Sequence, residues 1–311
     1  MRKEYADTIE RYRKDCILQE MTAESIRRYI SCVKIYAAFL EKCDISFEDV
    51  QYEDLTDFIQ YLKNERKVGV KTLENYLSSM NSLYDYLMFK KKVAVNLVPM
   101  IRKRYVKRYK KENGNGNRRK ILSVEEMGIF LNGILNPRDK AIATLLVKTG
   151  IRRGELIEVD LGDIDWTQNS IELKDKKKRS NTVVFFDDEC ARILRHWISI
   201  RDQEYVEDNC DALFIGQGGK RLNRHGVSEA VVKWAKMRGI YDTSSKENKD
   251  HFSPHNMRHC FTTYLLQNKM DREFVQELRG DARRSAVDIY NHIDPEKLRK
   301  AYLAAMPQFG L

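Results

Sequence analysis

The sequence predicts a mainly α-helical protein of two domains, with one small antiparallel β-sheet in the second domain. Three observations lead to this prediction. Apolar residues recur at helical spacing through the first 98 residues, a strongly basic stretch then interrupts the pattern, and short segments of β-type composition occur only beyond residue 160. A chain of 311 residues is also long enough for two domains of about 100–200 residues, each burying its own core.

Residues 1–98 are predicted to form a helical bundle. Apolar side chains recur three and four residues apart over residues 26–40, 55–62 and 73–87. Stripes of this kind more often form the core of a bundle than line a ligand site. The segment contains no proline and a single glycine, Gly69, as expected of compact helices.

Residues 99–120 are predicted to link the two domains. The stretch carries ten lysines and arginines against one acid, Glu112, and residues 113–117 alternate asparagine with glycine, which is typical of a flexible break. Its charge suits contact with DNA phosphates, which adds affinity without sequence information. A solvated charged loop explains the same run of residues equally well.

The second predicted domain covers residues 121–311. Ser123 and Glu126 have the spacing of a capping box that opens a helix, and a later helix is expected to end at Gly150. Three short segments, residues 164–166, 170–173 and 182–186, have strand composition and are separated by polar turns. They predict a three-stranded antiparallel sheet, after which helices resume from about Asp188.

Composition narrows the range of partners and compartments. The net charge of +10 and the pI near 9.1 favour a polyanionic partner, and nucleic acid is the usual one. No run of about 18 apolar residues occurs and the first residues lack a secretory core, so the protein is expected to be cytoplasmic, without a membrane partner. The six cysteines are scattered, which favours buried free thiols over a zinc site or a disulfide framework.

Two motifs lie near the predicted sheet. Gly150 can end one helix and leave Arg152 at the start of the next, where its fork of N–H donors can face a phosphate while Glu155 braces the turn. A lysine-rich turn, residues 174–179, follows between two predicted strands, and a lysine held there could donate a proton to a leaving oxygen. Taken singly, each is more often an ordinary feature of a protein surface.

A third motif opens a later helix. Ser253 suits the N-cap and Pro254 the first helical position, so His255 and Arg258 lie on one face near the positive end of the helix. A metal site is the alternative for three histidines spaced four residues apart: His251, His255 and His259. It is disfavoured because Pro254 keeps the first of them out of the helix and no HExxH glutamate is present.

The fourth motif contains Asp281, after Leu278-Arg279-Gly280, and Tyr290 nine residues later. Any one of the sixteen tyrosines is by default a packing residue, so the position alone selects nothing. In this order and spacing, however, the four motifs resemble the tyrosine recombinase (phage integrase) family. Arg152 matches the family's T-G-L-R-x-x-E-L arginine, residues 255–259 match H-x-L-R-H with methionine for leucine, and Tyr290 has the nucleophile's spacing.

The chain departs from the family pattern at the third box, where Asp281 replaces the usual histidine or tryptophan and Arg279 precedes Gly280. Asp281 could orient a neighbour such as His292 or Arg258. Archaeal members of the family look similar here, which favours an archaeal Xer-like or integrase-like lineage. More than one lysine of the turn could be the catalytic lysine of the family: spacing from Arg152 points to Lys176, while Lys177 and Lys174 remain alternatives.

The resemblance implies a helical core-binding, SAM-like domain and an α+β catalytic domain that together hold double-stranded DNA in a C-shaped clamp. Arg152 and Arg258 would hold the scissile phosphate, and Tyr290 would attack it to form a 3′-phosphotyrosine. Lys176 would be the general acid and His255 the general base and phosphate ligand, with Asp281 as the sixth residue of the site. This chemistry needs neither a metal nor another cofactor.

Active members of the family assemble as homotetramers on two DNA sites, and the same assembly is expected here. Without DNA, the chain is expected to be a monomer or weak oligomer. The segment after Tyr290, through Tyr302 and Met306, could dock on a neighbouring protomer or pack on its own domain. The expected activity is site-specific recombination, either integration and excision of a mobile element or resolution of DNA dimers. A type IB topoisomerase and a DNA-binding protein that has lost catalysis are the alternatives.

Overall fold

The computed structural model describes residues 2–106, 120–174, 181–204, 210–216, 218–245, 247, 250–281 and 293–311. The chain divides into two compact units, Met1–Glu112 and Asn113–Leu311, each with its own hydrophobic core. The fold class predicted from the sequence is confirmed: the chain is mainly helical and carries one three-stranded antiparallel sheet in the second unit. Among the described residues, no helix is both long and apolar enough to cross a membrane.

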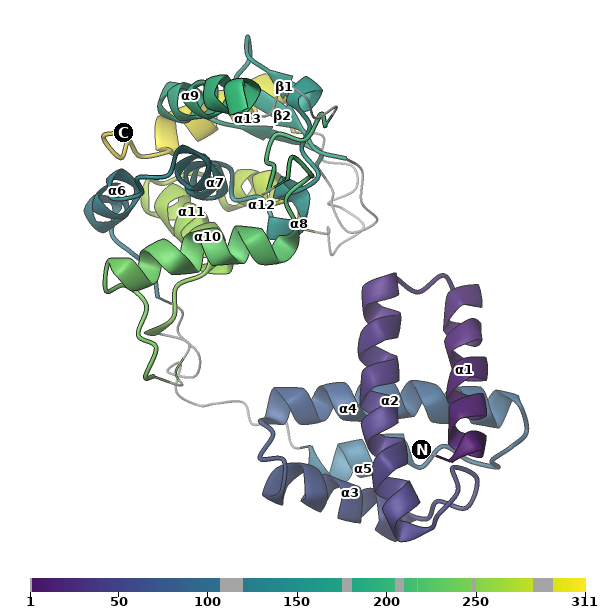
Figure 1. Ribbon diagram of the computed structural model, residues 1–311. Helices are drawn as coiled ribbons and strands as arrows, with labels where there is room; N and C mark the ends of the chain where they lie inside the picture. The colour runs from purple at the N-terminus through teal and green to yellow at the C-terminus, as the bar shows by residue number, and fades with distance from the viewer. Residues whose placement is uncertain are drawn as a thin grey trace. The chain divides into compact units, whose positions relative to one another are not determined.

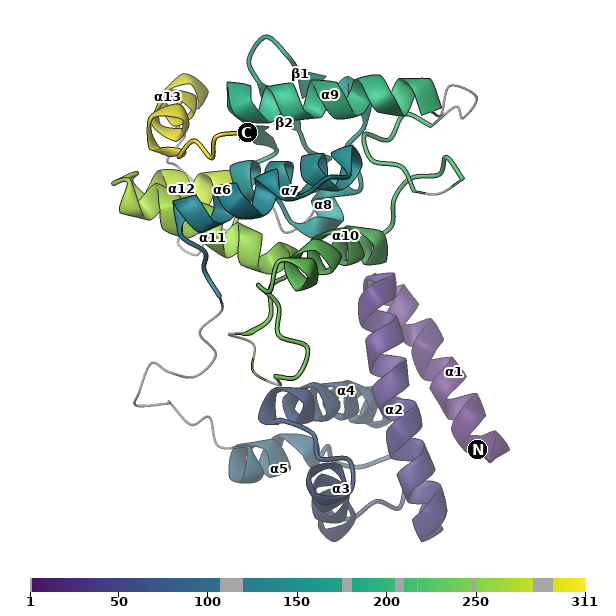
Figure 2. The same cartoon turned by 60° about the vertical axis from the view of Figure 1, so that its left-hand side comes forward.

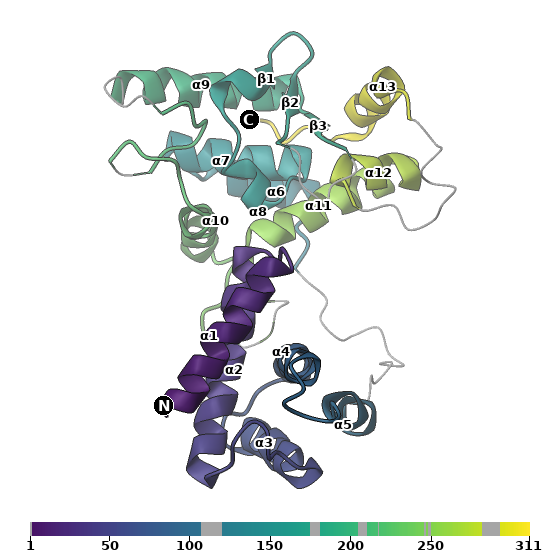
Figure 3. The ribbon, with the colours of Figure 1, turned by 90° about the vertical axis from the view of Figure 1, so that its right-hand side faces the viewer.

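The first unit is a bundle of helices: α1 (Lys3–Leu18), α2 (Ala23–Cys43), α3 (Tyr52–Asn64), α4 (Val70–Phe89) and α5 (Val98–Tyr105). Helices α1 and α2 lie side by side (Figure 1), and α4, seen end-on in Figure 3, packs against α2. The apolar stripes predicted from the sequence form its core, in which the rings of Tyr36 and Phe58 lie 4.8 Å apart.

Helix α5 corrects the predicted start of the linker at residue 99. Pro99 occupies the first turn of this helix, which its fixed backbone angle favours. Val98 and Ile101 are buried and belong to the core of the first unit, because α5 packs against α3 and α4. The remaining part of the predicted linker, residues 107–119, lies outside the described residues.

The helices of the second unit are α6 (Val124–Asn132), α7 (Pro137–Thr149), α8 (Arg153–Leu156), α9 (Asp188–Glu204), α10 (Arg224–Met237), α11 (Pro254–Gln267), α12 (Arg272–Arg279) and α13 (Pro295–Ala305). A short 3-10 helix, η1 (Leu161–Asp163), leads into the sheet. Helix α7 is central and packs against α9, α10 and α11 (Figures 1 and 2). Its residues from 141 to 149 are buried, so the elements that carry the motifs are built around a rigid helix.

The sheet has the strand order β1-β2-β3, with β1 (Ile164–Asp165), β2 (Ser170–Glu172) and β3 (Val183–Phe185). Ile171 on the central strand is paired with Ile164 on one side and Val184 on the other, and all three side chains are buried. The lysine-rich turn joins β2 to β3, as predicted from the sequence, but residues 175–180 of this turn lie outside the described residues.

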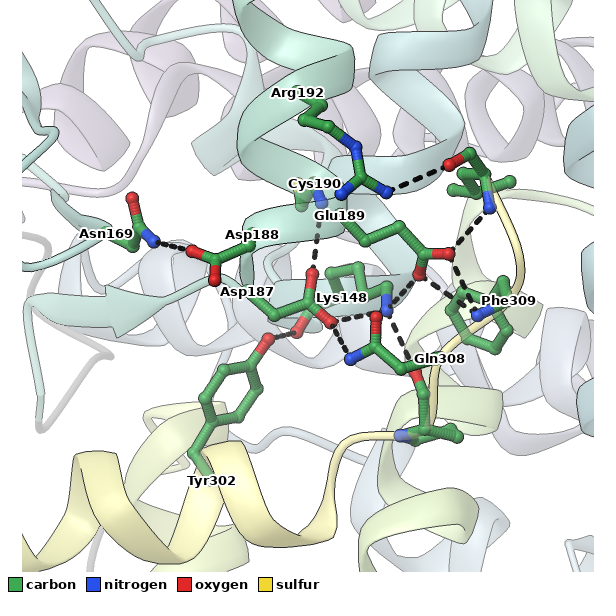
Figure 4. A network of polar contacts seen from close by, with 12 residues as sticks. Lys148, Asn169, Asp187, Asp188, Glu189, Cys190, Arg192, Tyr302, Gln308 and Phe309 are labelled. Atoms are coloured by element: carbon green, nitrogen blue, oxygen red, sulfur yellow. Dashed lines mark hydrogen bonds and ion pairs between the residues drawn. The ribbon is translucent and has the colours of Figure 1, made fainter.

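The end of the chain packs on its own unit through a buried polar network (Figure 4). The ammonium of Lys148, on α7, is fully buried and lies 2.6 Å from carboxylate oxygens of both Asp187 and Glu189. It also donates to the carbonyl of Pro307 at 2.8 Å. The backbone N–H groups of Phe309 and Leu311 donate to Glu189, at 3.0 and 2.7 Å. Of the two arrangements left open for this segment, the structure shows packing on the chain's own domain.

All six cysteines lie among the described residues and are free thiols. Cys16, Cys190 and Cys260 are buried, as predicted from the sequence, and burial raises the pKa of each thiol. The prediction is wrong for Cys43, which is exposed because it is the last residue of α2, where the helix leaves the core. Cys32 and Cys210 are half-buried.

Candidate active site

The first motif is shaped by the glycine that ends α7. Gly150 adopts the left-handed conformation at φ +63°, and an ideal Cβ placed on it would lie 2.3 Å from the Cδ1 atom of Phe261. Both the backbone angle and the lack of space therefore require glycine. The chain turns sharply here, which places Arg152 at the N-cap of α8 directly beside the start of α11.

Arg152 is held by Glu155, as predicted from the sequence. The backbone N–H of Arg152 donates to one carboxylate oxygen of Glu155 at 2.6 Å, and the guanidinium Nη1 donates to the other at 2.9 Å. The Glu155 side chain is 4% exposed, whereas that of Arg152 is 39% exposed. The carboxylate thus fixes the direction of an arginine whose side chain stays partly exposed.

The third motif opens α11 as expected. Ser253 and Asn256 form a capping box, and Pro254 is the first helical residue. His255 is exposed, and its ring is perpendicular to that of His259 with centroids 4.7 Å apart. Arg258, three residues further along the helix, is buried instead: its side chain is 6% exposed and donates to the carbonyl of Gly150 at 2.5 Å.

Asp281 brings the two arginines together. Gly280 ends α12 in the left-handed conformation at φ +58° and directs the chain toward the start of α8. One carboxylate oxygen of Asp281 lies 3.1 Å from Nη2 of Arg152 and 3.1 Å from Nη2 of Arg258. The other oxygen lies 3.0 Å from Nε of Arg279. Three guanidinium groups therefore meet at one carboxylate.

The charge of Arg258 is held in an unfavourable environment. Burial and the nearby charges of Arg152 and Arg279 lower its pKa to about 10, although Asp281 and Glu155 act in the opposite direction. Arg258 therefore remains charged at neutral pH, with its charge partly desolvated and crowded by like charge. An anion bound beside it would relieve this crowding, which is what a phosphate-binding arginine requires.

Several side chains of the first and third motifs line a cavity of about 460 Å³ in the second unit. Arg152, His255 and Arg258 all line it, so the first and third motifs converge although more than 100 residues separate them. Three further polar residues that the sequence did not single out also line the cavity: Arg153, Arg224 and Ser228. Arg153 occupies a position that the first motif leaves open to any residue, and Arg224 and Ser228 belong to no motif, which is why sequence patterns did not find them.

The second and fourth motifs are described only in part. Lys174, two residues after the end of β2, pairs with Asp160 at 2.6 Å, and Asp160 also pairs with Arg221. Lys176 and Lys177 lie outside the described residues, and so do Tyr290 and His292.

The histidine triplet that raised the metal alternative does not gather at one point. His251 stacks on the ring of Tyr241 at 4.5 Å and shares a hydrogen bond with the carbonyl of Ser245 at 2.8 Å. Within the described ranges, no group of three or more histidine, cysteine, aspartate or glutamate side chains has the geometry of a metal site.

Comparison with known proteins identifies the family to which the chain belongs. Residues 120–297 match the model of the phage integrase family, and residues 8–92 match that of the phage integrase N-terminal SAM-like domain. Tyrosine recombinase XerC of Corynebacterium glutamicum is 35% identical over 195 residues, which cover 61% of this chain and 59% of that relative. XerC of Escherichia coli K12 is 28% identical over 252 residues, which cover 79% of this chain and 78% of the relative.

Solved structures show the same fold at lower identity. The lambda integrase (75–356) dimer bound to a COC′ core site matches with a TM-score of 0.68 and 17% identity, over 93% of this chain and 98% of that chain. The XerH recombinase bound to palindromic difH substrate matches with a TM-score of 0.63 and 22% identity, over 89% and 78%. Because the family model alone covers more than half of the sequence, this chain belongs to the phage integrase family, the tyrosine recombinases.

Proposed function

We propose that this chain cleaves and rejoins DNA strands at a specific site through a 3′-phosphotyrosine intermediate on Tyr290. The class of enzyme, a site-specific DNA recombinase, follows from the family. The observation that carries the proposal for the site is the convergence of Arg152 and Arg258 on one oxygen of Asp281, at the edge of a cavity that both arginines line. We propose integration and excision of a mobile element, or resolution of DNA dimers, as the biological reaction.

The two arginines would act on the scissile phosphate. Displacement at phosphorus builds negative charge on the non-bridging oxygens, and fixed guanidinium groups stabilise that charge through charge-assisted hydrogen bonds. Arg152 is aimed by Glu155, and Arg258 is anchored by the carbonyl of Gly150. Neither side chain has to reorganise as the charge develops, and this is the main source of such stabilisation.

The proposed roles of the remaining residues follow the family pattern. Attack by the Tyr290 hydroxyl joins its oxygen to phosphorus and releases a 5′ hydroxyl, so the phosphodiester energy is kept in the protein–DNA bond. Lys176 would give the leaving oxygen its proton, and His255, which is exposed and lines the cavity, would act as general base and phosphate ligand. The chemistry calls for no metal or nucleotide cofactor.

We propose that Asp281 positions the arginines rather than contacting the phosphate as a donor. A carboxylate cannot donate a hydrogen bond at neutral pH, but it can hold Arg152 and Arg258 at a fixed separation and offset part of their mutual repulsion. The neutral donor that the family carries at this position would be replaced by a charge that acts through its neighbours.

Double-stranded DNA carrying a recombination site is the proposed partner, and the solved relatives support it: the lambda integrase and XerH structures are described as bound to DNA sites. A homotetramer on two sites is supported in the same way by a lambda integrase tetramer bound to a Holliday junction. Without DNA we propose a monomer or weak oligomer, acting in the cytoplasm where the DNA lies. The relatives named above are bacterial, so an archaeal lineage rests only on the third box.

Covalent trapping tests the proposal. Wild type and Tyr290→Phe are incubated with DNA that carries a candidate site taken from the sequence flanking the gene. The DNA also carries a nick that prevents religation. We expect a denaturation-resistant protein–DNA band in wild type that is absent in Tyr290→Phe. Tight binding of the same DNA by both proteins with no band in either would favour the alternative, a DNA-binding protein without catalysis.

A further inference from the structure

A second group of polar side chains lies beside the two arginines of the proposed phosphate site. Arg153 is the first residue of α8, and Arg224 is the first residue of α10. Both line the same cavity as Arg152 and Arg258. The guanidinium Nη1 of Arg153 donates to the hydroxyl of Ser228, which lies one turn after Arg224 on α10.

Arg224 approaches α8 closely because residue 154 has no side chain. An ideal Cβ on Gly154 would lie 3.1 Å from Nη2 of Arg224 and 3.2 Å from its Nε, which is tighter than nearly all real contacts of that kind. The guanidinium of Arg224 therefore rests against the backbone of α8. This places it next to Arg153, on the side of the cavity formed by α8 and α10.

The tether on Arg153 fixes its direction without cancelling its charge. A serine hydroxyl is neutral and takes up one of the five N–H donors of the guanidinium. Arg152 and Arg258 differ in this respect, since each pairs with a carboxylate, Glu155 or Asp281. Among the described residues, the contact that aims the charge of Arg153 is with a neutral group, and such an arrangement suits a second anion beside the first.

We propose that Arg153 and Arg224 form a second anion subsite, which binds the DNA phosphate next to the scissile one on the cleaved strand. The inference rests on the proposed function, because only a scissile phosphate held by Arg152 and Arg258 places a neighbouring phosphate at this wall of the cavity. The backbone of DNA presents phosphates in series, so a cation pair beside the first site meets the next in line. Such a contact sets the register of the strand without selecting bases.

Replacing single phosphates by neutral methylphosphonates tests the subsite. Full-length wild type, Arg153→Ala, Arg224→Ala and a control, Lys236→Ala, are measured for affinity on DNA carrying one methylphosphonate at each position around the cleavage site. Lys236 is an exposed residue of the same helix, three turns further along. We expect wild type and the control to lose about 10-fold in affinity when the adjacent phosphate is neutralised.

Arg153→Ala is expected to bind unmodified DNA about 10-fold more weakly and to lose nothing further when the adjacent phosphate is neutralised, because the contact is already gone. The dependence of its affinity on salt should also weaken, by about one in the slope of log K against log salt. Arg224→Ala should behave in the same way. Ser228→Ala keeps the charge of Arg153 but removes the hydroxyl that tethers it. Its affinity for unmodified DNA should therefore lie between those of wild type and Arg153→Ala.

Two results would overturn the subsite. One is that the losses of DNA affinity caused by Arg153→Ala and by the methylphosphonate multiply at every position of the methylphosphonate. The other is that the loss changes with the base pair at one position while the salt slope stays at the wild-type value, which is the behaviour of a base contact. Failure of the proposed function would show elsewhere, as the absence of the Tyr290-dependent covalent band, whereas Arg153→Ala at saturating protein should still form that band.

Discussion

The carboxylate of Asp281 lies 3.1 Å from the guanidinium of Arg258, and the same oxygen lies 3.1 Å from Arg152. The contact joins three elements, since Asp281 follows α12, Arg258 belongs to α11 and Arg152, 129 residues before Asp281, precedes α8. One atom therefore sets the separation of the two arginines proposed to hold the phosphate. Its negative charge also competes with that phosphate.

These two effects predict that DNA binding and cleavage separate in Asp281→Asn. The variant keeps the shape of the side chain but removes one negative charge beside three arginines, so the affinity for DNA should stay the same or rise. Cleavage at saturating DNA should slow by roughly 10- to 100-fold, because the arginines lose the carboxylate that aligns them. Single-turnover cleavage at several protein concentrations measures both quantities. A wild-type rate at saturation would show that Asp281 does not position the arginines.

The conformation and close surroundings of Gly150 predict that adding a side chain there lowers both stability and activity. Gly150→Ala would place a Cβ at φ +63° and 2.3 Å from the ring of Phe261, so we expect a cost of roughly 2–5 kcal/mol in unfolding free energy. Cleavage should also fall, because the carbonyl of Gly150 anchors Arg258. Denaturant unfolding and single-turnover cleavage measure the two effects.

Gly162→Ala is the matched control for this substitution, because the space around its Cβ is open and its backbone angle is ordinary. It should change the unfolding free energy by less than about 1 kcal/mol. In the double variant with Phe261→Leu, the part of the Gly150→Ala cost that comes from the ring should return, while the backbone strain remains. Equal stabilities of the two alanine variants would contradict this account.

Local signals explain which parts of the fold and the site could be predicted from the sequence. The turn at Gly150 and the start of α11 at Ser253 both depend on residues within four positions of one another, and both form as predicted. The sequence assigns all of α5 after Val98 to the linker, because its run of basic residues hides the apolar contact of Ile101. Helix α1 was not delimited, although Tyr5 and Ile9 have helical spacing.

Contacts between distant residues could not be predicted in this way. The pairing of Arg152 with Asp281 spans 129 residues and depends on where the fold places the N-cap of α8 and the residue after α12, which no local pattern encodes. The tether of Arg153 to Ser228 spans 75 residues. Lys148 lies in the last turn of α7, where sequence patterns treat a lysine as exposed, and yet its side chain is fully buried.

The buried ammonium of Lys148 predicts a large loss of stability when its charge is removed. Lys148→Met keeps the length of the side chain but leaves Asp187 and Glu189 buried without a cation, so unfolding should become easier by about 3–5 kcal/mol. The segment from Pro307 onward should also detach more readily, since Lys148 donates to the carbonyl of Pro307. Denaturant unfolding and hydrogen exchange of residues 307–311 measure these effects; unchanged exchange would contradict the second.

The lowered pKa of Glu189 predicts how the stability that this network provides depends on pH. Burial by itself raises the pKa of Glu189, but the hydrogen bonds from Lys148, Leu311 and Phe309 outweigh it and hold the pKa below its usual value. The ionised carboxylate therefore stabilises the folded state above the unfolded pKa of about 4.3, and this contribution is lost as pH falls through the lower folded value. The stability difference between wild type and Glu189→Gln should be constant from pH 6 to 8 and shrink below about pH 4.

The general acid can be assigned with DNA whose leaving 5′ oxygen is replaced by sulfur. A thiol has a pKa of about 8.5 and leaves without a proton, so this substrate should bypass the lysine. Lys176→Ala is expected to slow cleavage of ordinary DNA by about 100-fold or more and to cleave the sulfur substrate at close to the wild-type rate. Arg258→Ala should remain slow on both substrates, because its proposed role is to stabilise charge on the non-bridging oxygens.

The same experiment separates the three candidate lysines of the turn. Lys174→Ala should have little effect on either substrate, because Lys174 is already paired with Asp160 at 2.6 Å at the base of the hairpin. Rescue of Lys177→Ala instead of Lys176→Ala would move the general acid by one residue. If sulfur rescued none of the three variants, the proton would have to come from outside this turn. His255 would then be the next residue to substitute, because it is exposed and lines the cavity that Arg152 and Arg258 also line.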